Sequence, residues 1–320
     1  GVDLAEECES TYEANNPGTK FVGADITKLE ENYFEKQFGL IRNDDNLVLV
    51  GCSPCQYYSI INTSRDKSLK SKDLLRDFKR FADYYNPGFI LVENVPGLAT
   101  RQDSVLPEFL AFLDRKGYHY KWDIVNMSYY GVPQSRRRFS LVASRLGEVA
   151  MPVADTKQKL LKDAIGADKG FFPVEAGHKD DTAFMHTVSG LTPHDGGSRL
   201  AWKDDKELQL PCYVGKDHSF ADVYGRLKWD KPSSTITTMF YKTSCGRFSH
   251  PDEDRGLSLR EGATLQTFPL DYVFKAGSIG ANARLIGNAV PPEYGRRLGL
   301  LLKELKEKYD GTIQDESKSD

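Results

Sequence analysis

The order of apolar and polar positions predicts a β-sheet in the first half of the chain. Short apolar runs without strict alternation occupy residues 20–24 (KFVGA), 46–50 (NLVLV), 88–92 (GFILV) and 139–142 (FSLV). Runs of this kind are typical of strands that are buried on both faces of a parallel sheet. We therefore predict four buried strands in a parallel sheet.

Helical periodicity fills two of the intervals between these strands. Residues 74–85 (LLRDFKRFADYY) place Leu74, Phe78 and Phe81 on one helical face, and residues 105–117 repeat the pattern before a terminal glycine. Strands that alternate with helices favour an α/β fold with right-handed crossovers.

The pattern weakens in the second half of the chain. Residues 150–230 are rich in Gly, Asp, Lys and His, which indicates an irregular inserted or second domain. A helix is expected again at 257–268, where Ser258 and Glu261 have the spacing of a capping box. Gly262 inside that helix costs about 1 kcal/mol relative to Ala. A last helix begins near Pro292, and its apolar stripe consists of Leu298, Leu301, Leu302 and Leu305.

Composition narrows the function classes without naming one. Of 320 residues, 39% are hydrophobic and 28% charged, which predicts a sizeable core and excludes global disorder. A net charge of −3 means that any site for a polyanion must be a local basic groove. Five cysteines, an odd number, favour a reducing compartment, and no apolar run is long enough to span a bilayer. With no secretory leader in residues 1–20, we expect a cytoplasmic protein without a membrane partner.

Two cysteines in the stretch GCSPCQYYS offer candidate chemistry. Cys52 and Cys55 follow a predicted buried strand, and functional groups collect at the carboxyl ends of strands in open α/β sheets. A redox or zinc pair is one interpretation, although zinc needs about four ligands and no second Cys-x-x-Cys or His pair is present. From the residues alone, a nucleophile, a structural thiol and a redox or metal pair all stay open.

Three further segments carry polar groups at similar positions. Glu93 ends the strand in FILVENVPGL, although this segment alone favours a surface or capping role for it. Arg136 and Arg138 alternate in QSRRRFSLV and so share one face, where they would bind a phosphate or carboxylate unless the run is simply solvated. Residues 285–295 (LIGNAVPPEYG) are interpreted as a Gly-Asn turn that leads into a helix started by proline.

Taken in order, five short motifs resemble one family. They are PCQ at 54–56, ENV at 93–95, QSRRR at 134–138, REGATLQTFP at 260–269 and GNAVPP at 287–292. The ordered set is similar to the cytosine carbon-5 DNA methyltransferases of prokaryotic modification systems, over nearly the whole chain.

The resemblance implies a fold and a domain division. We expect a Rossmann-like α/β sheet domain that depends on S-adenosylmethionine, formed by residues 1–151 and 270–320. A small target-recognition domain, residues 152–269, would be inserted in it. The family's first motif, Asp-x-Phe-x-Gly-x-Gly, is not found in these 320 residues, so a segment outside them or another polypeptide would supply it.

The resemblance also implies roles for four catalytic residues. Cys55 would be the nucleophile that adds to carbon 6 of a cytosine flipped out of the duplex. Glu93 would contact ring N3 and the exocyclic amine and hold the proton that offsets the charge of the attack. Arg136 and Arg138 would position the base and the catalytic carboxylate.

Cofactor and DNA contacts follow from the same resemblance. S-adenosylmethionine, with S-adenosylhomocysteine as its product, would be bound by Asp3, Leu4, Asp25, Ile26, Pro54, Leu74, Asn288 and Val290. No metal is expected. Residues 57–73 fit the family's loop that closes over DNA, and base-reading side chains are expected between about 160 and 245. Candidate DNA contacts are Gln56, Ser59, Arg65, Lys67, Arg199, Lys203, Lys206, Tyr241 and Lys242.

Double-stranded DNA is therefore the expected partner of a monomeric enzyme, with a cognate restriction endonuclease that forms no stable complex with it. An RNA cytosine methyltransferase is the alternative enzyme. The long region between QSRRR and REGATLQ disfavours it, because reading a duplex needs a module that enters a groove. A DNA-binding relative with a dead site is the third hypothesis, which the intact Cys55, Glu93, Arg136 and Arg138 disfavour.

Overall fold

The structure, a computed structural model, describes residues 1–52, 57–58, 72–166, 192–205, 211, 214–215 and 221–316. Its strands form a two-stranded parallel sheet and a four-stranded mixed sheet with the order β3-β4-β6-β5. The strands are β1 (Val2–Asp3), β2 (Val22–Gly23), β3 (Val48–Gly51), β4 (Phe89–Asn94), β5 (His119–Asn126) and β6 (Arg137–Ser144).

The sheet confirms the α/β class but corrects the prediction of a parallel arrangement. β3 and β4 are parallel, whereas β6 is antiparallel to both β4 and β5. The ten residues between β5 and β6 are enough for an antiparallel return, while a parallel crossover needs about a dozen or more. β5 itself was not predicted, because HYKWDIVN is a largely exposed edge strand with many polar residues. β3 is not buried on both faces either, since Val50 is 60% exposed.

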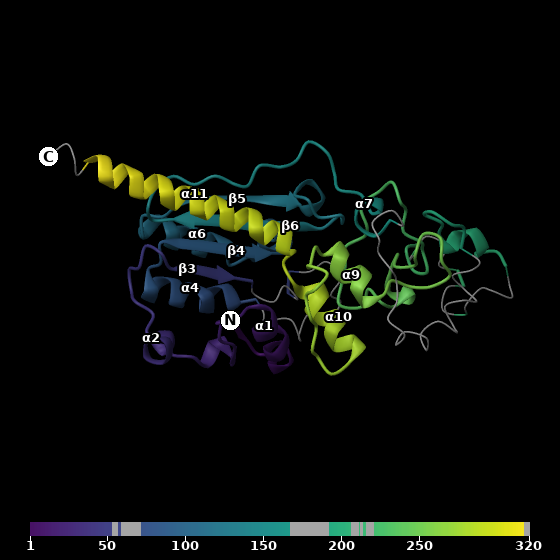
Figure 1. Cartoon of the computed structure of the whole chain (residues 1–320), viewed down its shortest axis with the longest axis horizontal. Coiled ribbons are helices and arrows are strands. Elements are labelled where there is room, and N and C mark those ends of the chain that lie inside the picture. Colours follow the sequence, from purple (N-terminus) through teal and green to yellow (C-terminus); the bar gives the residue numbers. More distant parts are fainter. Residues whose placement is uncertain are drawn as a thin grey trace.

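Helices cover both faces of the four-stranded sheet. α4 (Leu74–Tyr85) and α6 (Leu106–Arg115) confirm the two predicted helices, and they pack on the face that carries Ile90 and Leu141. The opposite face packs against α11 (Pro292–Glu316), which runs across the sheet (Figure 1). Its predicted leucine stripe is confirmed by the burial of Leu298 and Leu302. The Tyr294 hydroxyl donates to Ser140 Oγ at 2.8 Å, which fixes α11 to β6.

A second core joins the sheet domain to the irregular region. α7 (Lys162–Ile165), α9 (Leu259–Leu265) and α10 (Ile279–Asn288) share one apolar cluster with Phe240 and Phe248, and Figure 1 shows α9 and α10 between the sheet and the region that follows residue 192. The predicted capping box of Ser258 and Glu261 is confirmed, although α9 is shorter than residues 257–268. The Gly-Asn pair expected in a turn instead ends α10.

The remaining helical segments are short. They are η1 (Glu6–Cys8), α1 (Glu9–Asn15), η2 (Ile26–Lys28), α2 (Tyr33–Phe38), α5 (Gly97–Thr100), η4 (Met127–Tyr129), η7 (Arg199–Trp202) and η9 (Thr243–Cys245).

The structure explains the glycine inside α9. A Cβ atom at Gly262 would lie 2.0 Å from Cε2 of the buried Phe240 ring, so only a glycine lets this ring pack against the helix. Helix propensity alone predicts that Gly262 destabilises the helix, whereas the packing of Phe240 requires a glycine at this position.

We predict that Gly262→Ala lowers the free energy of unfolding by about 1–3 kcal/mol, the usual cost of overpacking a core. Gly299→Ala in α11 is the matched control, because a Cβ atom added there would meet nothing within 4 Å and the exposed helix should gain about 0.5–1 kcal/mol. Urea denaturation of both variants measures the difference. Equal stability of the two variants would contradict the packing explanation.

Candidate active site

The ends of β3 and β4 bring a thiol and a carboxyl together. Gly51 pairs with Val92, so that Cys52 and Glu93 follow side by side at the carboxyl edge of two parallel strands. The backbone N–H of Glu93 donates to the Cys52 sulfur. This edge is where open α/β sheets collect their functional groups.

Glu93 is held by an arginine from the neighbouring antiparallel strand. Arg138 Nε lies 3.1 Å from Glu93 Oε1, and both side chains are 14% exposed. Burial raises the pKa of the Glu93 carboxyl above its usual value, and the positive charges of Arg138 and Arg136 oppose that shift without cancelling it. Glu93 therefore keeps a proton to higher pH than an exposed glutamate does.

Arg136 has a different set of partners. It is buried, and its guanidinium donates to the backbone carbonyls of Ile236 at 2.9 Å, Gly287 at 3.1 Å and Ala289 at 3.3 Å. Arg136 thus ties the start of β6 to two distant segments, and its charge acts on Glu93 from this fixed position.

Two glutamines complete the junction around Arg136. Gln134 Nε2 donates to Gln266 Oε1 at 2.6 Å, and Gln134 Oε1 accepts from the backbone N–H of Ile236 at 2.8 Å. Gln266 Nε2 donates in turn to the carbonyl of Ile286 at 2.6 Å. The sequence motifs contain both glutamines, but no role was predicted for either. We call Gln134, Arg136 and Gln266 the buried clamp.

Of the two cysteines in the Cys-x-x-Cys pair, Cys52 lies within the described residues. Cys52 is exposed as a whole residue, yet burial of its thiol, and then the Glu93 carboxylate, raise the pKa of that thiol to about 12. A protonated thiol is a poor nucleophile and a poor metal ligand. Cys55 lies outside the described residues, as do Pro54, Gln56, Ser59, Arg65, Lys67 and Lys206.

Two predicted cofactor residues lie at the ends of adjacent parallel strands. Asp3 ends β1, and Asp25 follows β2, which pairs with β1. Asp3 Oδ1 accepts from Ala5 N at 2.8 Å, and Asp25 accepts two hydrogen bonds from Thr27, which lower the pKa of its carboxyl. Next to Asp3, the Leu4 side chain is 71% exposed. An acidic side chain beside an exposed apolar one suits a ribose and a flat ring.

The other predicted cofactor residues come from three elements. Ile26 is half-buried at the start of η2, Leu74 is the half-buried first residue of α4, and Asn288 is the exposed last residue of α10, followed by the half-buried Val290. An ion pair of Arg284 and Glu7, 2.9 Å long, joins α10 to the segment that follows Asp3.

The described candidates for DNA contact differ in exposure. Lys242 is exposed and lies 5.4 Å from the centre of the Tyr241 ring, and Lys203 pairs with Asp204 at 2.8 Å. Arg199 is only 2% exposed, which does not fit the prediction that it contacts DNA. A basic residue in an irregular region was expected at the surface, but η7 turns this side chain into the protein.

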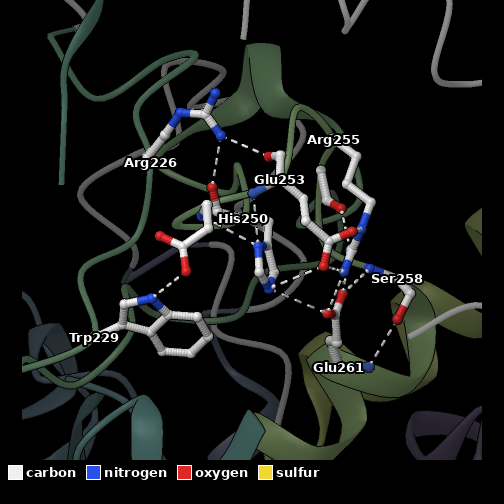
Figure 2. Close-up of polar contacts among 9 residues, drawn as sticks. Arg226, Trp229, His250, Glu253, Arg255, Ser258 and Glu261 are labelled. Carbon is white, nitrogen blue, oxygen red and sulfur yellow. Dashed lines mark hydrogen bonds and ion pairs between the residues drawn. The ribbon is translucent and has the colours of Figure 1, made fainter. Parts of the chain in front are cut away.

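A second polar cluster holds the start of α9, and the sequence predicted only its capping box. Arg255 donates to both oxygens of the buried Glu261 at 2.7 and 2.9 Å and also binds Glu253 (Figure 2). His250 Nδ1 accepts two backbone N–H groups, which leaves its proton on Nε2, 3.9 Å from Glu261 Oε1. Burial lowers the pKa of His250, so the imidazole is neutral at pH 7. Arg226 donates to the His250 carbonyl at 3.0 Å and extends the cluster.

Known proteins are similar to this chain in both sequence and architecture. Residues 1–304 match the family described as C-5 cytosine-specific DNA methylase. The type II methylase M.HgiDII of Herpetosiphon aurantiacus is 33% identical, over 96% of this chain and 89% of its own. The type II methyltransferase M1.BsuMI of Bacillus subtilis is 28% identical, over 93% and 72%. A prophage-encoded Escherichia coli protein described as a DNA modification methyltransferase has a similar solved structure, with a TM-score of 0.64, 18% identity and coverage of 96% and 91%.

The fold is thus of the Rossmann-like α/β class, and the family match makes the protein a methyltransferase. The chain belongs to the C-5 cytosine-specific DNA methylase family, which confirms the resemblance found in the sequence, and it is a DNA cytosine-5 methyltransferase. Within the described part of the chain, no helix is long and apolar enough to cross a membrane, and no group of three or more His, Cys, Asp or Glu residues could hold a metal ion.

We predict that Glu93→Gln changes the pH dependence of folding stability. Because the folded-state pKa of Glu93 is raised, its protonated form is favoured in the fold, and that stability is lost as pH rises through the folded pKa. The glutamine variant does not titrate, so its stability relative to the wild type should increase from pH 4 to pH 8. Urea denaturation across this range measures the trend, and the opposite slope would mean that the ion pair with Arg138 outweighs burial.

Proposed function

We propose that the protein methylates carbon 5 of a flipped-out cytosine in a short, specific duplex DNA sequence, through a transient bond from Cys55 to carbon 6. The thiolate adds to carbon 6 and makes carbon 5 electron-rich, so that carbon 5 can accept a methyl group. Loss of the proton on carbon 5 then re-forms the ring double bond and expels the thiolate. A base inside a duplex is not accessible to such attack, so the cytosine must leave the stack.

One observation carries the proposal: a buried, arginine-paired carboxyl lies at the strand edge from which the chain leads to Cys55. Cys55 follows Cys52 by only three positions, a stretch that spans about 11 Å at most. Cys52 neighbours Glu93 at this edge. A nucleophile and an acid within such reach of one another are what addition to cytosine needs. The high pKa of the Cys52 thiol favours Cys55 as the nucleophile of the two.

Glu93 supplies the proton that the attack requires. Addition of sulfur at carbon 6 places negative charge on the ring, and protonation at N3 offsets it. The raised pKa of Glu93 supports this role, because the carboxyl is more readily protonated than an exposed glutamate. Arg138 orients the carboxyl from the adjacent strand. Arg136 holds the sheet edge against the segments that contain Ile236 and Gly287.

The residues present fit S-adenosylmethionine. Asp3 and Asp25 offer carboxylates to ribose hydroxyls or adenine nitrogens, and the exposed Leu4 offers an apolar surface to the adenine ring. Ile26, Leu74, Asn288 and Val290, with Pro54, would complete the site. When bound, S-adenosylmethionine supplies an electrophilic methyl group and leaves as S-adenosylhomocysteine.

Duplex DNA is the substrate that this proposal requires, and the region between β6 and α9 is the expected reader of its sequence. The names of the bacterial relatives as type II methyltransferases support a role in a modification system, with a partner nuclease that recognises the same site. The enzyme would then act as a monomer in the cytoplasm of a prokaryote. Tyr241, Lys242 and Lys203 are the described candidates for contact with DNA.

We predict that Cys55→Ser lowers methyl transfer to duplex DNA by at least about a thousandfold, because a hydroxyl is a far weaker nucleophile than a thiolate. Incorporation of labelled methyl groups into DNA measures the rate. With duplexes that carry 5-fluorocytosine, the wild type should become covalently linked, because fluorine cannot leave as a proton does. The serine variant should stay unlinked.

Cys52→Ser is the matched control for this experiment. It makes the same sulfur-to-oxygen replacement at the neighbouring cysteine. The Cys52→Ser enzyme should still form the adduct and transfer methyl groups. If Cys52→Ser loses the adduct while Cys55→Ser keeps it, Cys52 is the nucleophile. A wild-type enzyme that methylates DNA without trapping would contradict the covalent route.

A further inference from the structure

Four side chains form a cluster that joins Tyr57 to residues on either side of the chain, Lys72 before α4 and Arg101 and Asp103 after α5. Two cations lie over the Tyr57 ring, with the Arg101 guanidinium 4.6 Å and Lys72 Nζ 5.2 Å from its centre. The Tyr57 hydroxyl donates to the carboxylate of Asp103. That carboxylate also pairs with Lys72 at 3.5 Å and with Arg101 at 3.2 Å. We call Tyr57, Lys72, Arg101 and Asp103 the Tyr57 clasp.

The next residue, Tyr58, is fixed by packing. Its side chain is buried in the core beneath α4 and α6, and its hydroxyl donates to the carbonyl of Lys72 at 3.1 Å. Its own carbonyl lies so close to Gly97 that a Cβ atom there would be 2.1 Å away. Tyr57 and Tyr58 together therefore join the chain just after the PCQ motif to Lys72, which stands beyond the segment 59–71.

These contacts fix the chain on the C-terminal side of Cys55, the proposed nucleophile, at Tyr57. On one side, Cys52 is held at the end of β3 by the backbone of Glu93. On the other side, Tyr57 is held by the clasp. Cys55 is three residues from the first point and two residues from the second, so a shift of Tyr57 moves the chain on which the sulfur is carried.

The Tyr57 clasp fixes the position of Tyr57 and contributes little to folding stability. Tyr57 is half-buried, and Arg101 and Asp103 have exposed fractions of 38% and 42%, so the ion pairs are screened by water and contribute little to folding. Their geometry is nevertheless specific, because a ring that contacts two cations and donates from its hydroxyl to a carboxylate has one preferred position. Tyr58 already supplies the buried anchor, so the clasp is not needed to hold the core together.

We infer that the Tyr57 clasp is a positioning device for the attacking sulfur: it fixes Tyr57 so that Cys55 is presented to the carbon 6 atom of the target base beside Glu93. This role rests on the proposed function of Cys55. A misplacement of about 1 Å can cost on the order of a hundredfold in rate, so contacts of little value for stability can matter for catalysis.

Three variants separate the parts of the clasp. Tyr57→Leu removes the ring and the hydroxyl, Tyr57→Phe keeps the ring that both cations contact, and Asp103→Asn removes the charge that holds both cations. The chain offers a matched control in α11, where Lys306 lies 6.0 Å from the Tyr309 ring and pairs with Asp310 at 2.5 Å. Tyr309→Leu and Asp310→Asn remove the same kinds of contact far from the sheet edge.

The test measures single-turnover adduct formation with 5-fluorocytosine duplexes at saturating DNA and S-adenosylmethionine. Tyr57→Leu should slow this step by about tenfold to a hundredfold, and Asp103→Asn and Tyr57→Phe by smaller factors. The dissociation constants for both ligands should stay within about twofold of the wild type, and the thermal midpoint within a few degrees. Both α11 variants should react at the wild-type rate.

Other outcomes overturn the positioning role. A wild-type rate in Tyr57→Leu shows that the clasp is dispensable, and weaker DNA binding equal to the rate loss shows that Tyr57 contacts DNA instead. A large fall in the thermal midpoint of all three variants assigns the clasp to stability. If Tyr57→Leu does not fold, Tyr57→Phe and Asp103→Asn decide by the same criteria. Failure of the proposed function is distinct, because the wild type itself would then form no adduct or Cys55→Ser would still form one.

Discussion

Arg136 donates hydrogen bonds to three carbonyl groups, two of them in buried hydrogen bonds, from two segments that lie about 100 and 150 residues away along the chain. A buried guanidinium is stable only when its donors are satisfied, and buried carbonyls also need partners. The guanidinium and the carbonyl groups therefore depend on each other for hydrogen bonds. These bonds would be lost if the start of β6 separated from the segment around Ile236 or from the end of α10. Gln134 and Gln266 add to the same junction, so the buried clamp makes one unit from motifs that are distant in sequence.

This junction determines the environment of Glu93. The Glu93 carboxyl lies beside this junction, and burial raises its pKa while the charge of Arg136 opposes the shift. Arg136 is fixed in place, since both terminal nitrogens of its guanidinium donate to carbonyl groups. Arg138, by contrast, stands outside the clamp and pairs with Glu93 directly. The two arginines thus have different structural roles. Arg136 holds distant segments of the chain together, whereas Arg138 contacts and orients the Glu93 carboxyl.

Local signals in the sequence predicted the helices α4, α6 and α11 and the capping box of α9, because periodicity and end residues report on each helix separately. They did not predict that β6 runs antiparallel, since strand direction depends on how the chain returns and not on the composition of the strand. The edge strand β5 was missed because it alternates little and is exposed. The site shows the same division. The order of motifs identified Glu93 and Arg138, but which arginine binds the carboxyl depends on tertiary contacts that only the fold provides.

The distribution of burial around the site has a consequence for catalysis. The contacts of the buried clamp, which connect distant segments, and the local Arg255–Glu261 pair are shielded from water and resist exchange. Contacts next to the PCQ motif are largely exposed ion pairs and a half-buried ring, which water can replace at low cost. The proposed covalent cycle requires the acid to stay fixed while the sulfur approaches the base and then leaves it. Glu93 is accordingly held from within the protein, whereas Tyr57, two positions after the proposed nucleophile Cys55, is held by partly exposed side chains.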